Sequence, residues 1–148
     1  MLNFFITLLI AMGLGLLIGL ERTYSHKTAG VRTYALVTMA SALLVLVGFS
    51  LIDLYGPVSV DLSRIIASIV SGIGFLGAGL IIFRDNHVAN LTTAAGVWMA
   101  AAIGVVVGLG MFIEALIATG LTIFVLHVVA YGERVIKKKI ANTEHDDR

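Results

Sequence analysis

Ser71-Gly-Ile-Gly-Phe-Leu-Gly-Ala-Gly79 lies inside a longer stretch, residues 65–83, that contains no charged side chain. As a helix, an uncharged apolar run of this length can cross a hydrocarbon core about 30 Å thick. Glycine is unfavourable in a soluble helix, but small residues let helices approach closely in lipid. Because a helix turns about 100° per residue, Gly72 and Gly79 share one face and the remaining small residues share another. The stretch therefore predicts a membrane-spanning helix with close neighbours on two sides.

The same letters, Gly72-x-Gly74-x-x-Gly77, also spell the dinucleotide-binding fingerprint. That fingerprint needs a preceding strand, a helix that begins at its last glycine, and an acidic residue about 20 positions further on. Here apolar sequence lies on both sides, and the first acidic residue downstream is Asp85. The context argues against a nucleotide site.

The composition is that of an integral membrane protein. Of 148 residues, 59% are hydrophobic and 13% are charged, with a mean hydropathy of +1.02; soluble domains have about 25% charged residues. The absence of cysteine excludes disulfides and thiolate metal sites. Met1-Leu2-Asn3 lacks the basic region of a signal peptide, so we expect the first apolar segment to be retained.

The pattern predicts an all-α polytopic bundle of five transmembrane helices within residues 1–132, followed by a basic juxtamembrane segment and short polar tail, 133–148. The expected spans are 3–20, 34–52, 65–83, 92–108 and 111–130.

The basic residues predict the orientation. Placing 21–33, 84–91 and the C-terminal tail in the cytoplasm puts nine of the ten Lys and Arg residues there and leaves Arg64 outside. We therefore expect an external N-terminus and a cytoplasmic C-terminus. The basic cluster in the tail, 134–139, is adequately explained by orientation and by contact with anionic lipid.

Small residues recur every four positions in two further spans, and these predict which helices pack together. We expect a tight core of the first, third and fourth spans, with the second and fifth exposed to lipid or at the interface of a homodimer. Trp98, deeper than an interfacial position, is expected to pack on a glycine face. The expected packing residues are Gly15, Gly19, Gly72, Gly74, Gly77, Gly79, Gly96, Gly104 and Trp98.

Charges are almost absent from the expected membrane interior. The second, third and fourth spans contain no Asp, Glu, Lys or Arg, whereas a proton relay or a cation path normally needs some. No nucleophile–base constellation lies in the spans, which argues against an enzyme. His26 and His87 are too isolated to predict a metal site.

Candidate functional residues gather at the expected cytoplasmic face. Glu21 and Arg22 leave the membrane together, and Arg32 with Thr33 opens the second span, so an ion pair between Glu21 and Arg32 is one expectation. Ordinary interfacial charges that set topology are the alternative. Capping side chains precede the fourth helix, where a free N-terminus can also attract an anion; capping is the expected role of Thr92. The residues concerned there are Asn90, Thr92 and Thr93.

Together these motifs resemble the MgtC/SapB family of bacterial inner-membrane proteins over about residues 8–125. The residues that carry the resemblance are Ile18-Gly-Leu-Glu-Arg22, Ala29-Gly-Val-Arg-Thr33, Gly72-Ile-Gly-Phe-Leu-Gly-Ala-Gly79, Leu91-Thr-Thr-Ala-Ala95 with Trp98, and Ala102-Ile-Gly104. Asn90 departs from the pattern, since glycine is common there. The chain resembles the short, SapB-like form without the soluble C-terminal domain of longer members.

The resemblance implies a role in adaptation to magnesium limitation, with no resident cofactor and, in some members, a partner such as the F-type ATP synthase. Three hypotheses follow: a non-enzymatic, dimeric modulator of a membrane partner or of ion homeostasis; a transporter or channel for magnesium or another ion; and a receptor for a small anion or lipid headgroup, held by Arg22, Arg32 and the start of the fourth helix. Nothing in the sequence indicates a nucleic-acid partner.

Overall fold

The computed structural model describes residues 2–56, 58, 60–84 and 87–132, so the basic tail expected at 133–148 lies outside the described residues. Five apolar helical segments are long enough to cross a membrane, which confirms an all-α, multi-pass membrane bundle. Its elements are α1 (Leu2–Tyr24), α2 (Val31–Tyr55), α3 (Leu62–Leu80), β1 (Ile82–Arg84), β2 (His87–Ala89), α4 (Leu91–Gly108), α5 (Phe112–Phe124) and the π-helix η1 (Val125–Val129).

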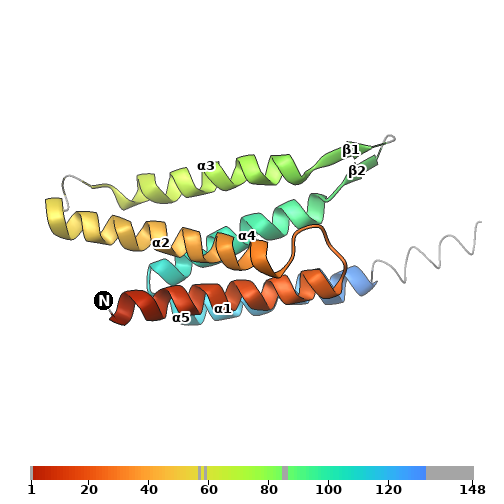
Figure 1. The fold of residues 1–148 in the computed structure, drawn as a ribbon, viewed down its shortest axis with the longest axis horizontal. Helices are drawn as coiled ribbons and strands as arrows, with labels where there is room; N and C mark the ends of the chain where they lie inside the picture. Colours follow the sequence, from red (N-terminus) through yellow and green to blue (C-terminus); the bar gives the residue numbers. More distant parts are fainter. Residues whose placement is uncertain (1, 57, 59, 85–86, 133–148) are drawn as a thin grey trace, which may run out of the picture.

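The helices run side by side, with α3 along one edge of the bundle (Figure 1). Helix α4 is the centre, because it contacts α1, α2, α3 and α5. The short hairpin β1–β2, the loop between α1 and α2, and the end of η1 lie together at one end, which we call the hairpin end (Figure 1).

The core differs from the one expected. Helix α2 packs extensively on both α1 and α4, whereas α3 buries only Ile69, Ile73 and Gly77. The core is therefore made of α1, α2 and α4, and α2 replaces α3 in it. Small residues in a sequence show that a helix can be approached closely, but not by which neighbour.

Helix α2 lies between two rows of glycines, which we call the glycine seam: Gly15 and Gly19 on α1, and Gly96, Gly104 and Gly108 on α4. A Cβ at Gly19 would lie 2.6 Å from the Cα of Val31, and one at Gly108 would lie 2.7 Å from the Cβ of Val45. A Cβ at Gly104 would meet the carbonyl oxygen of Thr38. The seam lets the backbones approach more closely than any side chain would allow.

The four glycines of α3, which we call the glycine string, lie in different surroundings. A Cβ at Gly72, Gly74 or Gly79 would meet no described atom within 4 Å, and one at Gly77 would reach only ordinary contact distance, 4.0 Å, from Ala94. The expected close neighbours on two faces of this helix are absent from the described protomer.

Several helix ends differ from the predicted boundaries, for local reasons. Helix α1 continues to Tyr24 and ends in a Schellman motif, in which His26 takes a left-handed φ of 53° and Lys27 N–H binds the carbonyl of Arg22. Helix α3 begins early because Asp61 caps it, accepting from Ser63 N–H at 2.9 Å. Hydrogen bonds from the Ser63 hydroxyl and N–H hold the pKa of Asp61 below its usual value.

The third span also ends earlier than predicted. After Leu80 the chain becomes extended, and Ile82 and Phe83 pair with Ala89 and Val88 in the antiparallel hairpin. An apolar run rich in β-branched residues satisfies a hydropathy criterion in either a helix or a strand, which is why this end was misplaced.

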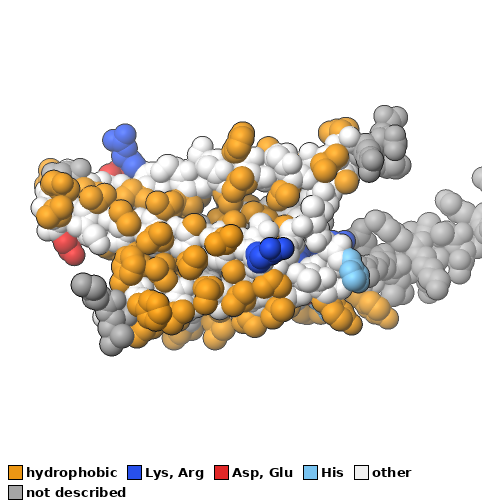
Figure 2. Space-filling model, viewed as in Figure 1, with side chains coloured by type: hydrophobic (Ala, Val, Ile, Leu, Met, Phe, Trp, Pro, Cys, Tyr) orange, Lys and Arg blue, Asp and Glu red, His pale blue; other side chains and the backbone are white. Residues whose placement is uncertain are grey.

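The outer surface is apolar, as contact with lipid requires. Figure 2 shows hydrophobic side chains spread across the visible face, with few charged ones. Trp98 belongs to this surface, since it is 44% exposed; its packing on a glycine face stays a prediction.

Candidate functional site

A buried charge pair lies on the last turn of α1, at the hairpin end. Arg22 is 2% exposed, and its Nε donates to Glu21 Oε2. The second carboxylate oxygen of Glu21 accepts from Ser25 Oγ at 2.8 Å. Arg22 belongs to the last turn of α1, and Ser25 is the first residue of the turn that follows the helix, so the end of α1 supplies both partners.

The other side of this cluster comes from η1. Arg22 Nη2 donates to the carbonyl oxygen of Leu126 at 2.9 Å, and this bond is buried. His127 Nδ1 lies 3.5 Å from Glu21 Oε1, with its side chain 56% exposed. We call Glu21, Arg22, Ser25, the Leu126 carbonyl and His127 the charge cluster; it joins the first helix to the last.

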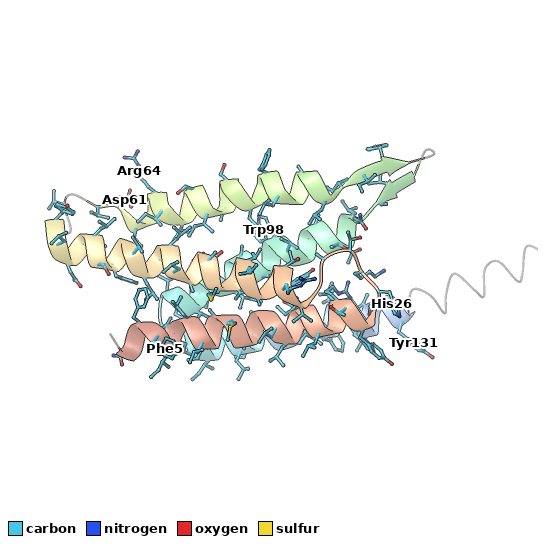
Figure 3. All side chains as sticks on the ribbon, in the orientation of Figure 1. Phe5, His26, Asp61, Arg64, Trp98 and Tyr131 are labelled. Carbon is cyan, nitrogen blue, oxygen red and sulfur yellow. The ribbon has the colours of Figure 1, made fainter. Side chains whose placement is uncertain are left out.

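A hollow of about 180 Å³ lies beside the charge cluster. Figure 3 places two of its lining residues, His26 and Tyr131, together at the hairpin end, opposite Asp61 and Arg64. The full lining is Tyr24, Ser25, His26, Leu126, His127, Ala130 and Tyr131. The hydroxyls and imidazoles of its lining give this hollow hydrogen-bonding capacity.

Arg32 and Thr33 lie elsewhere. Both are exposed on the first turn of α2, beside a separate open hollow of about 560 Å³ that Lys27 also lines. The expected ion pair between Glu21 and Arg32 is wrong, because Glu21 pairs with Arg22 and His127 instead.

The start of α4 is held differently from the prediction. Asn90 has a left-handed φ of 65° and makes no side-chain cap, so the expected capping is wrong. Asparagine tolerates this conformation better than most residues, which explains how it can stand where glycine is common. Its side chain instead accepts from Thr28 Oγ1 at 3.1 Å, linking the α1–α2 loop to α4, while Thr92 is exposed.

Thr93 is buried, and its backbone contacts a residue that the sequence did not single out. Tyr34 is fully buried, and its hydroxyl donates to the Thr93 carbonyl at 3.4 Å. Gly96 makes room for that hydroxyl, since a Cβ there would lie 2.5 Å from it. A tyrosine near the start of an apolar span was a usable signal, because a buried tyrosine hydroxyl usually finds a partner.

The described residues contain no group of three or more His, Asp or Glu side chains placed to hold a metal ion. Among them, Glu21 is the acidic residue that is not exposed, and its two oxygens are already bonded. The arrangement can orient helices and hold charge; it presents no activated nucleophile.

The model of the MgtC family matches residues 8–135. "Protein MgtC" of Salmonella typhimurium (strain LT2) is 47% identical over 119 residues, which are 80% of this chain and 49% of the relative. "Putative magnesium transporter YhiD" of Escherichia coli (strain K12) is 44% identical over 114 residues, 75% of this chain and 53% of the relative. An uncharacterized protein of Haemophilus influenzae is 37% identical over 140 residues, 91% of this chain and 59% of the relative. The chain thus spans about half the length of the curated relatives it matches, and no solved structure matches it.

Proposed function

Because the chain belongs to the MgtC family, we propose that it is a non-enzymatic protein of the bacterial inner membrane that acts on a membrane partner or on ion homeostasis when magnesium is scarce. The link to magnesium is supported by the name of the Escherichia coli relative. The role as a modulator is supported by the state of Glu21.

Glu21 carries the proposal because it is the acidic side chain of the described spans that is withdrawn from solvent. Magnesium binds through carboxylates and other oxygens and gives up its water reluctantly. The carboxylate of Glu21 is already engaged by Arg22, Ser25 and His127. The other described acidic residues are exposed and lie at the end of the bundle opposite the hairpin end. They are Asp53, Asp61 and Glu114. A buried cation path through one protomer therefore has no free carboxylate among the described residues.

We propose that the hairpin end faces the cytoplasm. The α1–α2 loop, the hairpin and the end of η1 lie together there (Figure 1), and these are the segments next to nine of the ten basic residues. The proposed partners are the bilayer, a second copy of the chain, and a membrane protein, for which the F-type ATP synthase is the first candidate by family resemblance.

Reconstitution tests the modulator against the alternative, a magnesium transporter. Purified protein and Glu21→Gln are placed in proteoliposomes with a trapped magnesium indicator, and empty liposomes serve as the control. We expect no flux above empty liposomes for either protein, together with poorer growth of a deletion strain in low magnesium. Saturable flux through the wild type would overturn the proposal, and its loss in Glu21→Gln would place that carboxylate on the path.

A further inference from the structure

The last helix changes its winding where it meets Arg22. Residues Val125–Val129 form a π-helical turn between α5 and the residues that follow. In an α-helix Ala130 N–H would bind the carbonyl of Leu126, four residues back, but here it binds the carbonyl of His127. The Leu126 carbonyl is thereby released from the α-helical pattern and accepts from Arg22 Nη2 at 2.9 Å.

Arg22 is held firmly enough to fix this turn. Its guanidinium is buried, and Nε is bonded to Glu21, which Ser25 holds in place. The imidazole of His127, within the same π turn, approaches Glu21 from the other side. Two adjacent residues of η1, Leu126 and His127, are therefore both held by the last turn of α1.

A π-helical turn is rare because α-helical winding is normally more favourable, and single π turns often occur at functional sites. Such a turn persists where its surroundings hold it in place. Here the support is the hydrogen bond from Arg22. It gives the Leu126 carbonyl a donor in place of the Ala130 N–H that this carbonyl would bind in an α-helix.

We propose that η1 is a two-state element controlled by Arg22. With Arg22 on the Leu126 carbonyl the turn is π-helical; when Arg22 leaves, Leu126 regains Ala130 N–H and the turn becomes α-helical. The change moves the following chain by one helical position, which is a rotation of about 100° and a shift of about 1.5 Å along the axis.

The residues that would turn are those on the far side of η1. Among the described residues these include Tyr131, which lines the hollow beside the charge cluster. Because coupling is reciprocal, a partner that binds Tyr131 in its rotated position would pull Arg22 away from Leu126. This inference does not depend on the proposed function, since the device would serve a transporter equally well.

Cysteine cross-linking can detect a one-residue shift. The chain has no native cysteine, so single pairs can be placed cleanly. Tyr24→Cys is paired in turn with cysteines at positions 128 to 131, and cross-linking by a short bis-thiol reagent is measured for the full chain in nanodiscs. The profile is then compared in the wild-type background and in Arg22→Met. Arg64→Met, which removes an exposed arginine at the other end of the molecule, is the matched control.

We expect Arg22→Met to move the cross-linking maximum by one residue toward the N-terminus, and Arg64→Met to leave it in place. A merely structural role for Arg22 would lower stability without moving the maximum. An unchanged profile in monodisperse Arg22→Met would overturn the proposal.

Arg22→Gln provides a second test if Arg22→Met does not yield monodisperse protein. The glutamine side chain keeps a polar group beside Glu21, but it ends two bonds short of the Nη2 position from which Arg22 reaches the Leu126 carbonyl. We expect the cross-linking maximum to move by one residue toward the N-terminus in this variant as well. An unchanged profile in monodisperse Arg22→Gln would overturn the proposal.

Discussion

The glycine seam and the glycine string contain the same residue type in apolar helices, yet their neighbours differ completely. On α1 and α4 each seam glycine faces an atom of α2 at a distance that no Cβ could tolerate. On α3 the string glycines at 72, 74 and 79 face open space. Glycine therefore marks the tightest interface of the protomer in one case and an unpartnered surface in the other.

The comparison shows where the unfavourable free energy of glycine in a helix is offset. A glycine inside a helix is about 1 kcal/mol less favourable than alanine. In the seam, close packing of α2 offsets this cost within the protomer. In the string, the described protomer provides no such contact, so this face of α3 is open to the second copy of the chain that we propose as a partner.

The largest expected effect is in the seam. Gly104→Ala would place a Cβ against the Thr38 carbonyl oxygen and 2.8 Å from Ser41 Cβ, and backbone cannot move aside cheaply. We expect a loss of about 3 kcal/mol in the free energy of unfolding, measured by circular dichroism during denaturation in mild detergent. The control is Gly13→Ala, where nothing lies within 4 Å. Equal stability of the two variants would contradict the seam.

The next largest effect is a loss of stability on substituting Gly96, and a second substitution at Tyr34 should partly restore it. Gly96→Ala brings a Cβ 2.5 Å from the Tyr34 hydroxyl, while the next nearest atoms lie at 3.4 and 3.5 Å. We expect a cost of about 2 kcal/mol for this variant and about 1 kcal/mol for Tyr34→Phe, which loses the bond to Thr93. Combined, the two should cost less than their sum, because phenylalanine removes the clashing oxygen. Additive costs in this double-mutant cycle would show that the hydroxyl is not what Gly96 accommodates.

A smaller effect tests the string as an interface. Gly74→Leu has room in the protomer, so unfolding should be nearly unchanged, but a leucine on α3 should weaken self-association. We expect at least a tenfold weaker dimer, about 1.4 kcal/mol, by light scattering across a concentration series in detergent. Gly120→Leu, at an open position on α5, is the control. A dimer unaffected by the α3 substitution would exclude this face.

The smallest effect has the opposite sign. Gly74→Ala adds a methyl group where no atom lies within 4 Å and improves the helix propensity of α3. We expect the free energy of unfolding to rise by up to about 1 kcal/mol, in the same denaturation assay. Destabilisation comparable to that of Gly104→Ala would mean that α3 is packed as tightly as the seam.

Hydropathy was sufficient to predict the five spans, because the length of an apolar run is a direct measure of what can cross a bilayer. It could not place the ends at Tyr24 and Leu80, which depend on the left-handed His26 and on hairpin pairing. Hydropathy also does not show which helices pack on one another. The bulky side chains of α2 therefore suggested a helix outside the core, whereas α2 lies in the core between α1 and α4.

The site was predictable only where its parts are close in sequence. Glu21 and Arg22 are neighbours on the last turn of α1 and Ser25 lies just after it, but the acceptor of Arg22 is a backbone carbonyl 104 residues away. A carbonyl carries no signature in the sequence, and neither does the π turn that releases it. Pairing Glu21 with Arg32 failed for the related reason that proximity to the membrane surface does not determine the direction of a side chain.

The central place of α4 also dictates an order of assembly. Helices α1 and α2 are joined by a short loop and pack on each other, so they can associate as a hairpin as soon as both have left the ribosome. The other half of the seam is made later, by residues 91–108, after α3 has been inserted. Until then the part of α2 that meets Gly96 and Gly104, with the Tyr34 hydroxyl and Ser41, lacks its α4 neighbour, and nascent chains halted before α4 should be captured by membrane quality control.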